Sequence, residues 1–150
     1  MIYLFTFLLA LPSGILWLMN AEVMVVAQMT THPDSLPWLI ALMTVLGQFI
    51  GYALLYEFAT RILARWAFVR RAVEKLKIER AGWGSRSLFV TGGLVGIPPL
   101  LGLFALYGSK RVGPLWQLLA CSMPMRFVWY CGWAYAADWM RDNLSFFSHC

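Results

Sequence analysis

Four long apolar segments, separated by short polar stretches, make up most of this 150-residue chain and limit what it can fold into. They cover residues 1–29, 38–58, 88–107 and 115–137. Charged residues are 13% of the chain, whereas soluble domains carry about 25%. The eight tryptophans and six tyrosines suit the aromatic belts found at bilayer interfaces. The sequence therefore predicts an integral membrane protein whose partners are membrane lipids.

Two of these segments are expected to cross the membrane as helices. A helix needs about 20 apolar residues, with a rise of ~1.5 Å each, to cross ~30 Å of hydrocarbon. Segments 38–58 and 115–137 meet that requirement.

The other two segments are interrupted and are expected to form helical hairpins. The interruptions contain proline and glycine: Pro12 and Gly14 in the first segment, and Gly96, Pro98 and Pro99 in the third. Proline removes a backbone donor and clashes with the preceding turn, so a continuous helix is disfavoured. Each hairpin would enter and leave the membrane on one side.

Basic residues are distributed unevenly along the chain. Residues 1–56 contain no Lys or Arg, whereas residues 61–86 hold eight of the twelve. By the positive-inside rule, the basic loop 61–86 is cytoplasmic, with Arg61 at the cytoplasmic end of the first spanning helix. A nucleic-acid patch is the competing interpretation. The flanking membrane segments argue against it, and no nucleic-acid partner is expected.

The predicted fold is a single all-α membrane domain, residues 1–150, with an inverted repeat. Two opposed re-entrant hairpins and two spanning helices form its halves, 1–60 and 87–138, and residues 139–150 form a tail. The halves have opposite orientation because the single basic loop 61–86 joins them. Residues 68–80 show helical spacing of apolar and basic side chains, which predicts an interfacial amphipathic helix. A solvated connector helix is the alternative.

Ionisable and amide side chains within the apolar segments mark the candidate site. Arg126 lies near the middle of the fourth segment, where a charge costs about 2.5–3.5 kcal/mol on insertion scales. Glu22 lies in the first segment and Gln48 in the second. Opposed hairpins would bring these three side chains together as a substrate or proton site. The alternative is a buried Glu22–Arg126 pair that only holds the fold.

Glycine spacing in the second segment indicates close helix packing. Gly47 and Gly51 form a small-xxx-small pair, and a substrate path is the second interpretation. Neither metal-ligand spacing nor a catalytic motif is found in the sequence. We therefore expect no metal, no cofactor and no enzymatic activity.

The chain resembles the DedA/VTT (SNARE-associated Golgi-like) membrane protein family, in particular its short YqaA-like members, over about residues 5–137. The resemblance rests on "NAE" with Glu22, "GQFIGYALLYEFATR" leading to Arg61, "GGLVGIPPLLGLFALYG", and "RF" at Arg126. It implies opposed re-entrant hairpins in an inverted repeat. It also implies movement of lipid-linked phosphates or phospholipids, often coupled to protons or membrane potential.

The expected function is therefore that of a transporter or flippase in a bacterial cytoplasmic (inner) membrane. Arg126 would engage an anionic headgroup, and Glu22 would exchange a proton or pair with Arg126. With two full spans per chain, a lipid-sized path calls for a homo-oligomer. The alternatives are a non-transporting accessory or assembly protein and a small ion or solute carrier.

Overall fold

The computed structural model describes residues 1–13, 20–64, 83–95 and 100–147, and these residues form helices joined by short loops. The helices are α1 (Ile2–Ser13), α2 (Ala21–Thr31), α3 (Pro37–Ala64), α5 (Trp83–Val95), α6 (Leu100–Lys110) and α7 (Leu115–Phe147). This part of the chain contains no strand, which confirms the all-α class.

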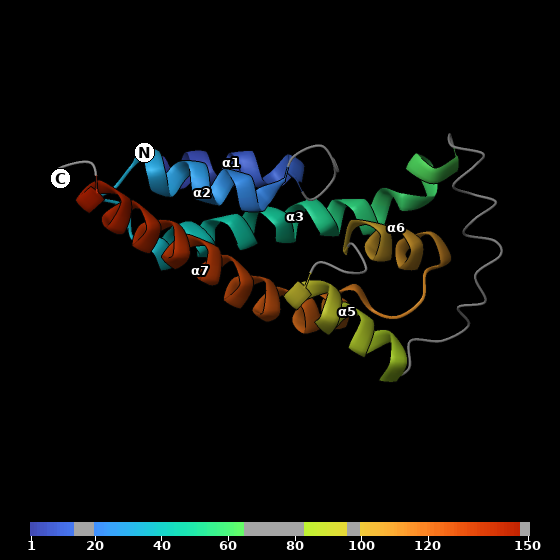
Figure 1. Ribbon diagram of the computed structural model, residues 1–150. Coiled ribbons are helices and arrows are strands. Elements are labelled where there is room, and N and C mark those ends of the chain that lie inside the picture. The colour runs from blue at the N-terminus through green and yellow to red at the C-terminus, as the bar shows by residue number, and fades with distance from the viewer. Residues whose placement is uncertain (14–19, 65–82, 96–99, 148–150) are drawn as a thin grey trace.

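The first and third apolar segments each form two helices, as the sequence predicts. The first segment holds α1 and α2, and the third lies within α5 and α6. Figure 1 shows that α1 and α2 run in opposite directions, as do α5 and α6, and that in each pair the first helix ends and the second begins toward the middle of the molecule. Of the predicted breaking residues, Pro12 is the second-last residue of α1. The others, Gly14, Gly96, Pro98 and Pro99, lie outside the described residues.

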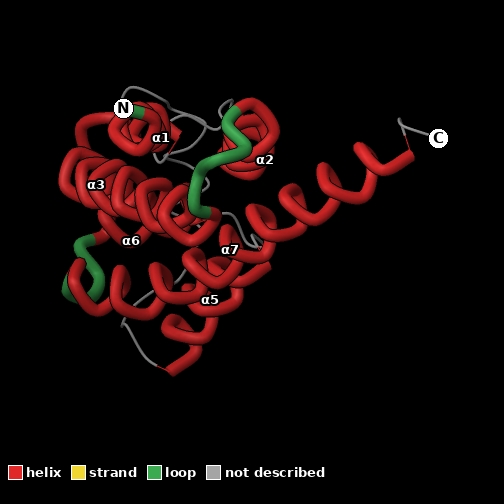
Figure 2. Tube along the Cα trace, turned by 90° about the vertical axis from the view of Figure 1, so that its left-hand side faces the viewer, coloured by secondary structure: helices red, strands yellow, loops and turns green. Residues whose placement is uncertain are grey.

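The two long helices extend beyond the apolar segments that predict them. α3 continues to Ala64, past Phe58, and α7 continues to Phe147, through most of the predicted tail 139–150. Figure 2 shows the C-terminal part of α7 extending away from the other helices. Hydropathy marks the apolar stretch alone, so it underestimates helices that continue with polar residues. The predicted amphipathic helix 68–80 falls entirely in residues 65–82, outside the described residues.

The helices of the two halves exchange packing partners. In each half, the first short helix packs on the long helix of its own half: α1 on α3, and α5 on α7. The second short helix packs on the long helix of the other half: α2 on α7, and α6 on α3. The long helices α3 and α7 also contact each other. The same pattern of contacts therefore occurs twice in one chain (Figure 1).

Glycines allow several of these helices to approach closely. A Cβ on Gly47 of α3 would lie 2.7 Å from the Cβ of Ala10 in α1. A Cβ on Gly93 of α5 would lie 2.7 Å from the carbonyl oxygen of Ser122 in α7. A Cβ on Gly108 of α6 would meet the backbone of Tyr56 in α3. The tightest contacts thus lie at three of the packed helix pairs.

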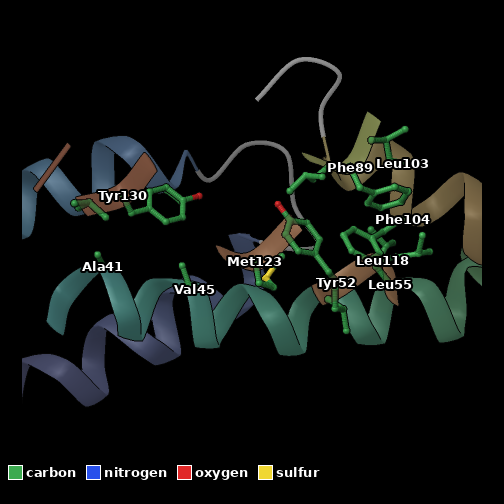
Figure 3. Packing of buried hydrophobic residues seen from close by; sticks show 14 of the residues in the cluster. Ala41, Val45, Tyr52, Leu55, Phe89, Leu103, Phe104, Leu118, Met123 and Tyr130 are labelled. Carbon is green, nitrogen blue, oxygen red and sulfur yellow. The ribbon is translucent and has the colours of Figure 1, made fainter. Parts of the chain in front are cut away.

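Aromatic rings fill the core between α3, α5 and α6. The rings of Tyr52 and Phe104 stack with centroids 4.9 Å apart. Phe89 meets Phe104 and Tyr107 edge to face, at 5.0 and 5.1 Å. Figure 3 shows Tyr52, Phe89 and Phe104 in one cluster with Leu103 and Leu118. Such pairs contribute about 0.5–1.5 kcal/mol beyond their area burial.

One helix of the described residues, Pro37–Ala59 within α3, is long and apolar enough to cross a membrane by length and composition. Large apolar side chains are also exposed on the surface of the molecule. They include Leu4, Phe5, Leu8, Phe49, Phe58, Trp116, Val128 and Trp139. Exposed apolar surface of this kind indicates contact with lipid or protein rather than water.

Candidate functional site

A buried arginine and a glutamate from distant parts of the sequence form an ion pair between α7 and α2. Arg126 of α7 is 7% exposed, and its Nη1 donates to Oε1 of Glu22 in α2 at 3.1 Å. The indole Nε1 of Trp129 donates to the same carboxylate oxygen at 3.0 Å. Two donors from α7 therefore hold one acceptor from α2, and charge-assisted bonds of this kind are stronger than neutral ones.

A cation–π contact and a set of hydrogen bonds connect this pair to α3 and α1. The Arg126 guanidinium lies 5.5 Å from the centre of the Tyr130 ring. The Tyr130 hydroxyl donates to Oε1 of Gln48 at 2.9 Å, and Nε2 of Gln48 donates to the Ser13 hydroxyl at 3.2 Å. The Ser13 hydroxyl donates in turn to the carbonyl of Ala10 at 2.7 Å. A chain of polar contacts therefore runs through all four helices, α2, α7, α3 and α1.

Helical spacing accounts for this convergence. Trp129 and Tyr130 follow Arg126 by three and four residues, so the three side chains share one face of α7. Gln48 and Tyr52 are likewise four residues apart on α3. Tyr52 interacts electrostatically with Arg126, and Figure 3 shows the hydroxyls of Tyr52 and Tyr130 turned toward one another.

The glutamate of the pair lies at the surface of a groove between α2 and α7. The groove has a volume of about 410 Å³ and is lined by Asn20, Glu22, Val23, Val26, Ala27, Trp129 and Trp133. The Glu22 side chain is 26% exposed and that of Arg126 9%. The carboxylate therefore faces the groove, whereas the guanidinium lies behind it.

One polar atom of the buried arginine has no partner. The Nε of Arg126 is buried and makes no hydrogen bond. An unmet buried donor costs about 1–3 kcal/mol, more for a charged group. A guanidinium that pairs with one carboxylate oxygen and leaves Nε unmet can still take up further acceptors, such as phosphate oxygens.

The structure brings three of the predicted site residues together and leaves Arg61 apart from them. Glu22, Gln48 and Arg126 come together through direct contacts or through the Tyr130 bridge. Arg61 does not join them, because it lies exposed near the end of α3, with its guanidinium 5.6 Å from the Phe58 ring centre. Gly51 is buried in α3.

Sequence reasoning missed four contributors to this network: Ser13, Tyr52, Trp129 and Tyr130. Spacing from Arg126 identifies the two residues of α7, and spacing from Gln48 identifies Tyr52. Ser13 carries no such signal, since a single serine at a helix end is common in any apolar segment.

Metal binding is not indicated by the part of the chain that the structure describes. No group of three or more His, Cys, Asp or Glu side chains gathers there in a way that could hold an ion.

Comparison of the chain with protein-family models, with curated proteins and with solved structures finds no match.

Proposed function

We propose that this protein is a membrane transporter of the DedA/VTT type that moves a phospholipid or lipid-linked phosphate across a bacterial cytoplasmic membrane. The Glu22–Arg126 pair, whose glutamate lines a largely apolar groove, is the observation that carries this proposal. Charges within apolar helices are costly, and they commonly mark a transport pathway. An apolar groove with a charged pair in its wall suits an amphipathic substrate.

In this proposal α3 and α7 span the membrane and the two short-helix pairs are re-entrant hairpins. The repeated exchange of partners, α1 on α3 with α2 on α7 and α5 on α7 with α6 on α3, supports an inverted repeat. Broken helices that meet near the bilayer midplane are a recurring transporter plan. The basic loop 61–86 then faces the cytoplasm, and a second copy of the chain would complete a lipid-sized path.

The transport step would exchange the partner of Arg126. A phosphate entering the groove would replace the Glu22 carboxylate on the guanidinium, which stays cationic at every physiological pH. The displaced carboxylate would take up one proton, because an unpaired charge is unfavourable at that depth. Return of Glu22 to Arg126 would release both the proton and the phosphate, which gives a direct route to proton coupling.

A lipid translocation assay in proteoliposomes tests this function. The double variant Glu22→Gln with Arg126→Gln removes both charges together and so leaves no unpaired charge. Loss of a charged contact of about 1.5–3 kcal/mol predicts a fall in rate of roughly tenfold or more. Arg86→Gln is the matched control, since Arg86 is exposed on α5.

The same experiment separates transport from the alternative of an accessory protein. The pair also ties α2 to α7, and a purely structural pair would affect accumulation alone. If the double variant is folded and monodisperse but does not move labelled lipid, transport is supported. If wild type moves no phosphate-bearing lipid tested, the proposal is wrong.

A further inference from the structure

A second groove runs along the outward face of α3, away from the Glu22–Arg126 pair. It has a volume of about 620 Å³ and is lined by Phe49, Ile50, Ala53, Leu54, Glu57, Phe58, Arg61 and Arg111. The seven residues from α3 recur at helical spacing and form one stripe. The first four are apolar, and the charged side chains lie toward the C-terminal end of α3.

The charged end of this groove carries an excess of positive charge. Nη1 of Arg111 donates to Oε2 of Glu57 at 2.8 Å, and Nη2 donates to the backbone carbonyl of Glu57 at 3.4 Å. Within the described residues, Arg61 contacts the Phe58 ring and no carboxylate. Two guanidiniums therefore face one carboxylate, and all three side chains are exposed to the surroundings.

The backbone holds Arg111 at this place. Its φ is 51°, in the left-handed region that favours glycine. Its N–H donates to the carbonyl of Gly108 at 3.2 Å, and that of Val112 donates to Tyr107 at 3.1 Å. These two bonds form a Schellman motif that ends α6. A non-glycine residue at this position is unusual, and here its side chain reaches the groove on α3.

We propose that this groove binds an anionic phospholipid of the cytoplasmic leaflet. One acyl chain lies along the apolar stripe, and the headgroup phosphate binds between Arg61 and Arg111. The rise from Phe49 to Arg61 is about 18 Å along α3, close to the ~15 Å hydrocarbon depth of one leaflet. The cytoplasmic leaflet is rich in anionic lipid, which basic side chains near the surface attract.

Glu57 would limit the affinity of this groove for a lipid phosphate. Its carboxylate occupies Nη1 of Arg111 and repels a phosphate beside it. Glu57→Gln removes that repulsion. The Schellman motif and the bond to the Glu57 backbone carbonyl both remain in this variant, so Arg111 keeps its position. The groove therefore predicts opposite effects for two neighbouring charge changes, and a merely structural role would not produce them.

Native mass spectrometry of the full chain in detergent tests the site, with phosphatidylglycerol and phosphatidylcholine of identical acyl chains as probes. We expect wild type to retain phosphatidylglycerol at least several-fold better than phosphatidylcholine. Arg61→Gln should abolish that preference and Glu57→Gln should increase it. Arg86→Gln, which changes the charge of an exposed residue outside the groove, should leave it unchanged.

A variant of the apolar stripe tests the acyl-chain part of the site. Ala53→Trp fills the groove and should reduce retention of phosphatidylglycerol with all charges intact. Equal retention of both lipids by wild type, or a loss of preference in Glu57→Gln, overturns the proposal. Conversion of a dimer to a monomer by Ala53→Trp, with lipid retention unchanged, would assign the groove to a second copy and also overturn it. None of these outcomes depends on transport through the Glu22–Arg126 site.

Discussion

At the scale of single residues, polar side chains inside apolar sequence locate the candidate site. Glu22, Gln48 and Arg126 stand out because each is costly to bury alone, and the structure brings them together. Their partners are less visible in the sequence. Trp129 and Tyr130 are apolar enough to belong in any membrane helix, so only their three- and four-residue spacing from Arg126 indicates their role.

The Tyr130 hydroxyl should contribute measurably to stability. It is fully buried and donates to Gln48 at 2.9 Å, so Tyr130→Phe leaves a buried acceptor unmet. We expect a loss of about 1–3 kcal/mol in the free energy of unfolding, measured by thermal or denaturant unfolding in detergent. Tyr135→Phe is the control, because Tyr135 is 52% exposed. Equal stability of the two variants would mean that the Gln48 contact contributes nothing.

Replacement of Arg111 by glycine separates backbone strain from side-chain function. Glycine relieves a left-handed conformation that costs other residues roughly 1–2 kcal/mol. The exposed pair with Glu57 contributes about 0.2–1 kcal/mol in return. Arg111→Gly should therefore leave the unfolding free energy unchanged or raise it by about 1 kcal/mol, while phosphatidylglycerol retention falls. A large loss of stability would show that the side chain holds α6 against α3.

At the scale of helices, hydropathy and proline placement predict which segments form helices but not where they end. The end of α1 at Ser13 and the start of α6 at Leu100 lie at the predicted interruptions. The extensions of α3 to Ala64 and α7 to Phe147 could not be read from hydropathy, since those turns carry polar residues. The sequence also does not predict which helices pack together, because a glycine gives no indication of which helix it will face.

Gly93 and Gly132 form a matched test of that packing. A Cβ on Gly93 would lie 2.7 Å from the carbonyl oxygen of Ser122 and 3.0 Å from the Cβ of Met125. Gly93→Ala should therefore separate α5 from α7 and cost about 1–3 kcal/mol. A Cβ on Gly132 meets nothing within 4 Å, so Gly132→Ala should stabilise α7 by about 0.5–1 kcal/mol through helix propensity. The melting temperature should therefore fall in Gly93→Ala and rise in Gly132→Ala. A shift of the same sign in both variants would contradict the close contact of α5 with α7 at Gly93.

At the scale of the whole molecule, the packing of helices from one half on the long helix of the other half bears on the proposed membrane topology. The two pairs of short helices approach the middle of the molecule from opposite ends, and the second helix of each pair packs on the long helix of the other half (Figure 1). Such an arrangement is difficult to reconcile with both pairs entering a membrane from one side. From charge, the sequence predicts that the two pairs enter the membrane from opposite sides, since residues 1–56 lack Lys and Arg whereas residues 61–86 are strongly basic. The contacts of α2 with α7 and of α6 with α3 depend on tertiary packing, and no pattern in the sequence predicts them.

Single cysteines at residues 85, 109 and 143, in a background without Cys121, Cys131 and Cys150, test this topology. The opposed-hairpin arrangement places Ser85 and Ser109 on the cytoplasmic side and Asn143 outside, because α5 and α6 return to their side of entry whereas α7 crosses. An impermeant maleimide should therefore label intact cells at residue 143 alone, and label residues 85 and 109 after permeabilisation. Labelling of residue 109 from outside would mean that α5 and α6 together cross the membrane. Lys110 and Arg111 would then face outward, against the positive-inside rule, and the anionic-leaflet site at Arg61 and Arg111 would lose its physical basis.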